Sequence, residues 1–233
     1  MTAAVRTQAS AEGSTPSGRS LSSVTRAPAE LRARPQWVAW RREPRDGRTT
    51  KVPYNAKTGA LASTIDPATW TTFAEAVAYC EQHPDMTGVG YVLGKDDPYV
   101  GIDLDHCLDG FTEELAPWAQ TIVEALDSYT EITPSDEGLR IFVRGSLPPS
   151  GRKRGNVEMY AQARFLTITG QHLANTPVTI EDRGDALLRV HADVFGKVEP
   201  AATNGTSHVV AREPLLLADA ELLRTARAAT NGA

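Results

Sequence analysis

The sequence lacks the long apolar segments that cross a membrane or direct a protein to secretion. No run of about 18 apolar residues occurs in its 233 residues, so we expect no transmembrane helix and no membrane partner. The N-terminus has no apolar segment of the kind found in secretory signals. Cysteine is also scarce, and Cys80 and Cys107 do not have the spacing of a metal-binding pair. We therefore expect two reduced thiols in a cytosolic protein.

Basic residues are nearly absent from the middle of the chain. Residues 59–139 hold 16 acidic residues and one basic residue. By contrast, residues 1–58 hold 11 basic and 4 acidic residues, and residues 140–164 hold 6 basic residues and 1 acidic residue. A solvated acidic surface accounts for most of the middle block. The two basic blocks beside it are suited to hold a polyanion near a metal-binding centre.

Hydrophobic periodicity divides the chain into regions. Residues 1–28 are small and polar without a period, which predicts a disordered arm. Residues 197–212 predict a linker by the same criterion, and residues 213–233 predict the start of a further helix. Between them, residues 29–196 show strands in pairs and clusters with few crossover helices. This order predicts an α+β domain with mainly antiparallel sheets.

Local patterns predict the elements of this domain. We expect two strands at 36–40 and 49–55, joined by the charged loop "RREPRDGR", and helices at 71–83, 116–126 and roughly 180–195. Thr72 and Glu75 form the pattern of a capping box at the start of the first helix. A hairpin is expected from "GVGYVLG" and "YVGIDLD", followed by four short strands at 129–133, 139–145, 156–160 and 164–170.

The stretch "YVGIDLDHC", residues 99–107, carries the first candidate site. Apolar residues alternate with Asp103 and Asp105, which predicts a strand with one buried face and both carboxylates on the other face. Glu158 stands on the same kind of face within "NVEMY". Three carboxylates that converge from two strands are suited to hold two Mg²⁺ ions, and the ions would cancel their mutual repulsion. The alternative is a row of acids on a solvated sheet face, because the Asp-x-Asp pattern alone is weakly specific.

The stretch "TPSDEGLRIFVRG", residues 133–145, carries the second candidate. Ser135 and Gly138 form a turn before a strand, and alternation places Arg140 on the side of the carboxylates. A turn with free N–H groups followed by an arginine suits a phosphate group. Arg164 and Thr169 lie nearby in "RFLTITG". The alternative is an ordinary turn and a half-buried strand whose threonines have high β-propensity.

Taken together, these motifs resemble a known family. The ordered set runs from about Pro35 to Phe195 and includes "KVPYN", "DPATW", "VGIDLDHC", "SYTEITPS", "IFVRG", "EMY" and "RFLTITG". It resembles the bifunctional primase-polymerase domain of phage and plasmid replication proteins, in the archaeo-eukaryotic primase superfamily. Single pieces are weakly specific, but their shared order is highly specific.

The resemblance implies a fold and a set of roles. The fold would be an RNA-recognition-like catalytic core with an adjoining N-terminal α/β subdomain, over residues 29–196. Asp103, Asp105 and Glu158 would be the catalytic ligands of two Mg²⁺ or Mn²⁺ ions. The incoming nucleotide would be bound by a second set: Ser135, Gly138, Arg140, Arg164 and Thr169. Arg140 stands where the family usually has histidine, so it can bind phosphate but cannot accept a proton at neutral pH.

The implied activity is template-dependent synthesis and extension of primers in phage or plasmid DNA replication. The partners would be a single-stranded DNA template and NTP or dNTP substrates, in the cytoplasm of a bacterial host. The template phosphates would be followed by four basic residues, Lys51, Arg152, Lys153 and Arg154, unless "GRKRG" is only a soluble loop. The segment from 213 resembles the helical start of a part that precedes a helicase module, so we expect the N-terminal part of a larger primase-helicase.

Two other classes of function use the same residues. A two-metal nuclease needs the three carboxylates but no triphosphate pocket. A non-catalytic module that binds a replication origin needs only the basic blocks, and its affinity would not depend on Asp103 or Asp105.

Overall fold

The structure, a computed structural model, describes residues 21–109, 112 and 114–196. The predicted linker at 197–212, the segment at 213–233 and residues 1–20 of the predicted arm lie outside the described residues. Within the described ranges, no helix has both the length and the apolar character needed to cross a membrane.

The strands form two sheets, and all pairings between the named strands are antiparallel. The four-stranded sheet has the order β2-β1-β3-β9 and contains β1 (Trp37–Arg45), β2 (Arg48–Tyr54), β3 (Gly88–Leu93) and β9 (Arg164–Ile168). The five-stranded sheet has the order β5-β6-β4-β8-β7 and contains β4 (Tyr99–Leu104), β5 (Thr130–Ile132), β6 (Leu139–Arg144), β7 (Lys153–Arg154) and β8 (Val157–Tyr160). The prediction of an α+β domain with antiparallel sheets is therefore confirmed. The expected hairpin of "GVGYVLG" and "YVGIDLD" is wrong, because β3 and β4 are paired in different sheets.

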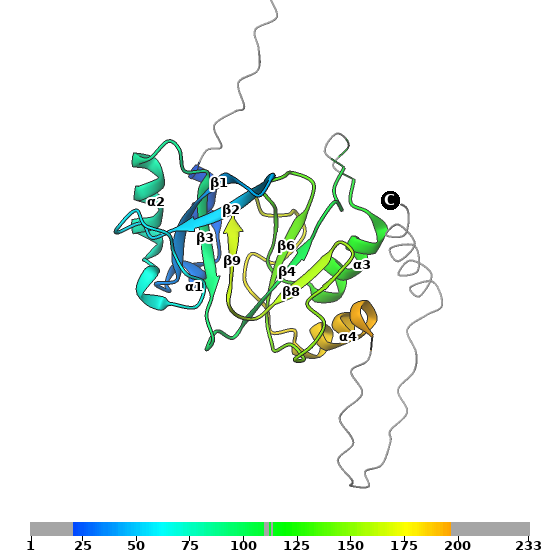
Figure 1. Cartoon of the computed structure of the whole chain (residues 1–233). Helices are drawn as coiled ribbons and strands as arrows, with labels where there is room; N and C mark the ends of the chain where they lie inside the picture. The colour runs from blue at the N-terminus through cyan, green and yellow to red at the C-terminus, as the bar shows by residue number, and fades with distance from the viewer. Residues whose placement is uncertain (1–20, 110–111, 113, 197–233) are drawn as a thin grey trace, which may run out of the picture.

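The described helices are α1 (Ala29–Arg32), α2 (Phe73–Gln82), α3 (Pro117–Leu126) and α4 (Gly184–Phe195), with two 3-10 turns, η1 (Leu21–Arg26) and η2 (Pro67–Thr69). In Figure 1, α2 lies at the outer side of the four-stranded sheet, and α3 and α4 lie at the outer side of the five-stranded sheet. The predicted capping box of α2 is confirmed, because the Thr72 and Glu75 side chains each accept a hydrogen bond from the other residue's backbone N–H. The capping box satisfies backbone donors at the start of α2 that have no partner within the helix.

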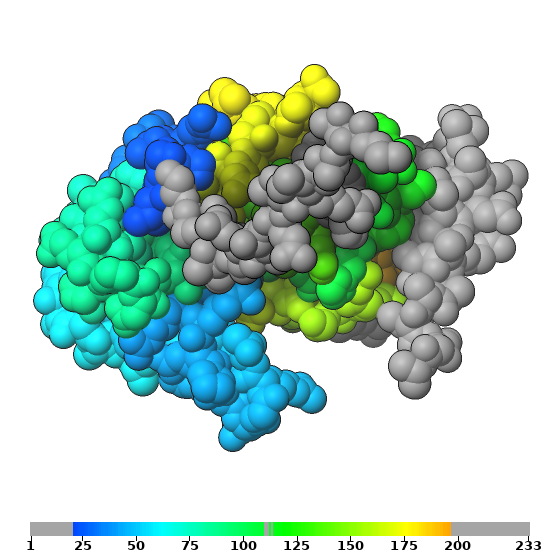
Figure 2. All heavy atoms as spheres, turned by 90° about the horizontal axis from the view of Figure 1, so that it is seen from above, coloured from blue at the N-terminus to red at the C-terminus, as the bar shows by residue number. Residues whose placement is uncertain are grey.

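The segment "RREPRDGR" is not the loop that we expected. β1 and β2 continue through it and pair as far as Arg45 and Arg48. Asp46 and Gly47 make the turn with φ of 50° and 74°, the left-handed pair that a two-residue hairpin turn requires. β1 pairs with β3 only over Trp37–Trp40, so the far half of the hairpin is a two-stranded ribbon. Figure 2 shows this blue ribbon projecting from the body.

Strand β4 is buried on both faces, whereas its alternation predicted one buried face. Val100, Ile102 and Leu104 belong to the apolar cluster that includes residues of α3 and α4. The opposite face is covered by β9. In Figure 1 this edge strand of the four-stranded sheet lies next to the five-stranded sheet. A Cβ on Gly101 would lie 2.1 Å from Leu166 Cδ1, so the Leu166 side chain of β9 packs directly on Gly101 and would have to move to admit a side chain there.

The last residues of the predicted disordered arm are a packed part of the fold, and the structure corrects that part of the prediction. Val24 in η1 and Ala27 after it are each only 2% exposed. Ser23 donates a 2.7 Å hydrogen bond from its hydroxyl to Thr169 O beside the end of β9. A Cβ on Gly170 would lie 1.9 Å from Ser23 O, so glycine is required where η1 crosses this segment. Isolated apolar residues give no periodic signal, which is why the sequence did not reveal this contact.

A chain that starts at residue 29 should therefore melt below a chain that starts at residue 21. Losing the burial of one valine side chain costs about 2 kcal/mol, and for a domain of this size that lowers the melting temperature by roughly 4–8 °C. Differential scanning calorimetry of the two truncated chains measures the difference. Equal melting temperatures would show that η1 adds nothing to stability.

Both cysteines are buried free thiols, as expected. Burial raises the pKa of Cys80 and of Cys107 to about 12. Because the thiolate is the reactive form, almost none of it is present at pH 8. A thiol-reactive dye should therefore label neither cysteine in the folded chain at pH 8, and both after unfolding in guanidinium. Rapid labelling of the folded chain would contradict this packing.

Candidate functional site

A row of charged residues crosses the five-stranded sheet, one from each strand. In spatial order they are Glu131, Arg140, Asp103, Glu158 and Lys153, each directly opposite the next in the strand register. Residues directly opposite in an antiparallel sheet point to the same face. The prediction that Asp103, Glu158 and Arg140 share a face is therefore confirmed.

Asp103 and Arg140 form a buried ion pair at the centre of this row. The Arg140 Nε lies 2.7 Å from Asp103 Oδ1, and the two side chains are 5% and 11% exposed. The Arg140 Nη1 also donates to the backbone oxygen of Thr167 and, at 2.7 Å, to its hydroxyl. Arg140 thus joins a catalytic candidate on β4 to strand β9 of the other sheet. A two-bond grip on a phosphate would require one of these bonds to break.

Glu158 is surrounded by donors. It accepts from Lys153, from the Tyr160 hydroxyl at 2.6 Å and from Arg164 Nη2 at 3.3 Å. Burial alone would raise the pKa of Glu158, but the hydrogen bonds from Lys153 and Tyr160 outweigh burial, and the pKa is lowered. Lys153 and Arg164 are about half exposed, so both can leave Glu158 for another partner.

Asp105 is the most open of the three carboxylates. Among the described residues, its side chain makes no hydrogen bond or ion pair. Burial raises the pKa of Asp105, and the charges of Asp103 and Glu158 raise it further. The three carboxylates therefore sense one another's charge, as the sequence predicted. At Asp103 and Glu158, basic side chains of the protein already offset this repulsion. The sequence-based prediction had assigned that role to metal ions alone.

The three carboxylates fit divalent cations in chemistry, since hard ions such as Mg²⁺ prefer carboxylate oxygen ligands. Within the described ranges, however, no group of three His, Cys, Asp or Glu side chains is arranged to hold a metal ion. In this structure Asp103 pairs with Arg140, and Glu158 pairs with Lys153 and Arg164. Metal binding therefore remains a prediction.

A cavity of about 480 Å³ opens over the row, in the angle between the two sheets. It brings together most of the predicted site residues: Lys51, Asp103, Asp105, Ser135, Arg140, Glu158 and Arg164. The five-stranded sheet supplies the carboxylates and Arg140, and the turn between its strands β5 and β6 supplies Ser135. Strands β2 and β9 of the other sheet supply Lys51 and Arg164. The cavity volume is in the range of pockets that enclose a small molecule.

Two of the predicted nucleotide-binding residues do not line this cavity. A Cβ on Gly138 would lie 2.7 Å from Leu104 O, so this glycine allows the turn to approach β4. Thr169 donates from its hydroxyl to Ile132 O at 2.7 Å and lies near η1 instead. Both residues have a clear structural role, and their contact with a nucleotide stays a prediction.

Lys51 lines the cavity, although its side chain is exposed. Its Nζ lies 5.7 Å from the centre of the Trp40 ring, a distance typical of a cation–π contact. Burial, followed by the charge of Arg140, lowers the pKa of Lys51 to about 8. This position suits a contact with a substrate better than the predicted contact with a template phosphate.

The other predicted DNA-binding residues lie on and beside β7. Lys153 pairs with Glu158, and Arg154 donates from Nη1 to Val194 O at 2.8 Å. Arg152 is half-buried, and its carbonyl accepts a 2.9 Å hydrogen bond from Met159 N. These bonds tie the basic stretch to the protein itself, and its role in binding DNA stays a prediction.

Glu131 is a residue that the sequence analysis missed. Its carboxylate is fully buried and accepts from Tyr129 Oη at 2.9 Å and from the N–H groups of Thr169 and Gly170 at 3.1 and 2.9 Å. Burial raises the pKa of Glu131, and the charge of Arg140 opposes that shift. Glu131 and Arg140 thus hold the end of β9 between them. The sequence held one signal of this buried carboxylate, an acidic residue inside the short strand "YTEIT".

The fold and the site define an α+β protein with three carboxylates and three basic side chains around one cavity between two antiparallel sheets. No family model matches the chain. Over 142 residues, the chain is 40% identical to a curated protein named DNA Primase-polymerase from Nitratiruptor phage NrS-1. This match covers 58% of the chain, and the chain spans only 19% of the length of that relative. The resemblance to a phage primase-polymerase, predicted from the motifs, is confirmed.

Proposed function

We propose that this chain is the catalytic domain of a DNA primase-polymerase, a template-dependent nucleotidyltransferase that makes and extends primers in phage or plasmid replication. One observation carries the proposal: Asp103, Asp105 and Glu158 line the same cavity as Arg164 and Lys51. Carboxylates for divalent ions beside cations for phosphates form the combination that nucleotidyl transfer requires. The similarity to a phage protein named DNA Primase-polymerase supports the same reaction.

In this proposal Asp103, Asp105 and Glu158 hold two Mg²⁺ or Mn²⁺ ions. Ions bound there would supply Lewis-acid activation of a 3′-hydroxyl and neutralise the leaving pyrophosphate. Arg140 fixes Asp103 in place through its 2.7 Å ion pair, so that this carboxylate is oriented before substrate binds. Lys153 and Arg164 would leave Glu158 as the ions bind, because both side chains reach solvent.

The basic side chains of the cavity would bind the triphosphate. Arg164 and Lys51 stand on the wall opposite the carboxylates, and the Ser135 hydroxyl lies in the turn at the cavity edge. Arginine can bind a phosphate with two parallel hydrogen bonds, which makes Arg164 the principal candidate once it leaves Glu158. A two-metal nuclease needs no triphosphate pocket, so binding of a nucleotide in the absence of DNA would favour the polymerase over the nuclease.

The wider context is also a proposal. The five-stranded sheet carries α3 and α4 packed on one face, an arrangement consistent with an RNA-recognition-like core. The template would be single-stranded DNA, and the substrates NTPs or dNTPs, in the cytoplasm of a bacterial host. The relative is much longer than the matched segment, which is consistent with a helicase module on the same full-length chain in a larger primase-helicase.

Primer synthesis tests the proposal directly. The chain is incubated with single-stranded DNA, labelled dNTPs or NTPs, and Mg²⁺ or Mn²⁺, and the products are resolved by length. We expect ladders of new strand that require both the template and a metal ion. Shortening of the DNA without incorporation would establish the nuclease instead. Binding to DNA with neither reaction would establish a non-catalytic module.

A further inference from the structure

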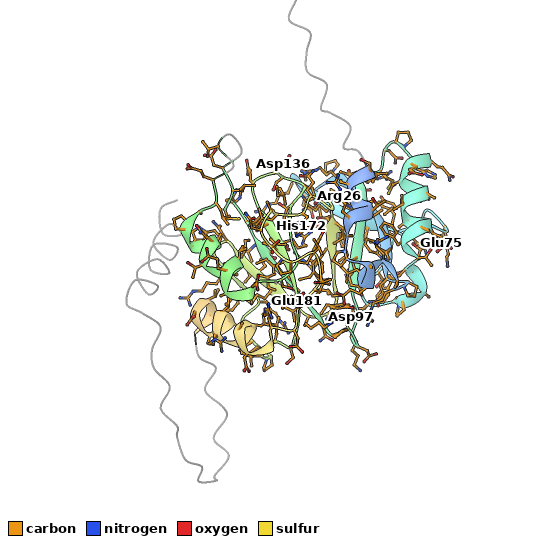
Figure 3. The ribbon with its side chains drawn as sticks, turned by 180° about the vertical axis from the view of Figure 1, so that it is seen from behind. Arg26, Glu75, Asp97, Asp136, His172 and Glu181 are labelled. Carbon is orange, nitrogen blue, oxygen red and sulfur yellow. The ribbon has the colours of Figure 1, made fainter. Side chains whose placement is uncertain are left out.

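A second cleft adjoins the site cavity. It has a volume of about 820 Å³ and shares the lining residues Thr64 and Ala163 with that cavity, so the two hollows are neighbours. Its walls come from the segment before β1, the loop between β2 and α2, and the β3–β4 and β8–β9 turns. In Figure 3, Asp97 of the β3–β4 turn and Asp136, beside Ser135, lie at opposite ends of the body. The Ser135 turn thus lies at the cavity, and the β3–β4 turn lies at the cleft.

The charges that the cleft presents to solvent are mainly positive. Lys57 and Lys95 are exposed, and Lys57 has only a 3.6 Å contact with the exposed Glu75. Asp97 contributes little to the surface, because its side chain is 1% exposed and is held by Arg34 at 2.9 Å and Gln36 at 2.7 Å. Asp96 is the exposed acid of the lining. The two lysines thus stand ready for an anionic ligand.

Apolar side chains line the same cleft as the two lysines. Ile65 is 77% exposed, although it is a large aliphatic residue. Pro67 and the edge of Trp70 continue this surface, and the Trp70 indole N–H donates to Ser63 O at 2.6 Å, which fixes the ring. Sites for unpaired nucleic acid combine cations, which contact phosphates, with aromatic or apolar side chains, which contact bases, and the lining of this cleft contains both kinds of side chain.

The size and position of the cleft narrow the ligand further. Its volume lies in the range that encloses a small molecule, so it has room for a short unpaired stretch of nucleic acid. The basic residues predicted to follow DNA have partners within the protein in this structure, Lys153 at Glu158 and Arg154 at Val194 O, although Lys153 is exposed enough to leave Glu158. The cleft offers a strand a second route to the site cavity.

We infer that this cleft holds an unpaired DNA strand beside the catalytic cavity, with phosphates on Lys57 and Lys95 and a base against Ile65. The inference rests on the proposed function, because that function gives a strand reason to enter the adjoining cavity. The three side chains are exposed, so replacing them leaves the packed core unchanged.

The test measures binding of a labelled oligothymidine of about 12 nucleotides by fluorescence anisotropy across NaCl concentrations, without metal or nucleotide. The variants are Lys57→Gln, Lys95→Gln and Ile65→Ser. Each lysine variant should lower the slope of log affinity against log salt by about 0.7 and weaken affinity several-fold. Ile65→Ser should weaken affinity about threefold to tenfold without changing the slope. Arg189→Gln, an exposed change on α4, should match the native chain.

The Arg48→Gln variant tests a competing DNA-binding surface, the exposed end of the β1–β2 ribbon. If Arg48→Gln lowers affinity and slope while the cleft variants bind as the native chain does, the inference is wrong. Primer synthesis separates this failure from failure of the proposed function. If the native chain incorporates nucleotides and the cleft variants bind DNA as the native chain does, only the inference is overturned. If the native chain incorporates no nucleotide but the cleft variants lose DNA binding, only the proposed function is overturned.

Discussion

Replacing Asp105 by alanine is expected to abolish nucleotide incorporation while leaving the melting temperature unchanged or slightly higher. The carboxylate lines the site cavity, and it makes no ion pair within the described part of the chain. Its pKa is raised by burial and by the charges of Asp103 and Glu158, so the ionised form is unfavourable in the fold and its removal relieves repulsion. Loss of a group that stabilises charge in a transition state costs about 10²–10³ in rate. Primer-extension rates and calorimetry measure the two effects on the same sample.

Asp103→Ala is the matched comparison, because it removes a carboxylate two residues away from the same strand face. Activity should fall as in Asp105→Ala, but stability should fall too, since Arg140 loses its 2.7 Å partner. The sequence alone predicted an intact fold for both variants, and the buried ion pair changes that expectation for Asp103. Near-native incorporation by Asp105→Ala would show that this carboxylate is not a metal ligand.

Replacing Arg140 by alanine is expected to cause the largest loss of stability among the site residues. The guanidinium is buried, pairs with Asp103, and bonds to Thr167 on the neighbouring sheet. Removing one partner of a buried ion pair costs about 3–5 kcal/mol, because the other charge stays buried without compensation. For a domain of this size, the melting temperature should fall by roughly 6–20 °C. Denaturant unfolding followed by circular dichroism gives the free energy.

Arg164→Ala is the control, since it removes the same type of side chain from the same cavity. Its partner contact with Glu158 is 3.3 Å long and its side chain is 47% exposed, so the loss of stability should be within about 1 kcal/mol. The double variant Asp103→Asn with Arg140→Met should regain part of the stability lost by Arg140→Ala, because it leaves neither charge unpaired. Equal destabilisation by Arg140→Ala and Arg164→Ala would contradict a special role for the buried pair.

The sequence by itself determined much of the local structure. The two-residue period of "YVGIDLDHC" and "NVEMY" correctly placed Asp103 and Glu158 on matching faces, because that period depends only on backbone geometry. The same reasoning placed Arg140 on the side of the carboxylates. The Thr72–Glu75 cap was readable because its partners are three residues apart. The family resemblance likewise came from short motifs in a shared order.

Only the tertiary structure decided what those faces meet. The sequence grouped "RFLTITG" with the preceding strands, yet β9 pairs with β3 in the other sheet and covers β4. That placement buries Arg140 against Thr167, brings Arg164 to Glu158 and makes Gly170 the crossing point for η1. It also turns Glu131 into a buried clamp on the end of β9. The physical reason is that the period of a strand tells which residues share a face, whereas the choice of neighbouring strand depends on contacts between residues far apart in the chain.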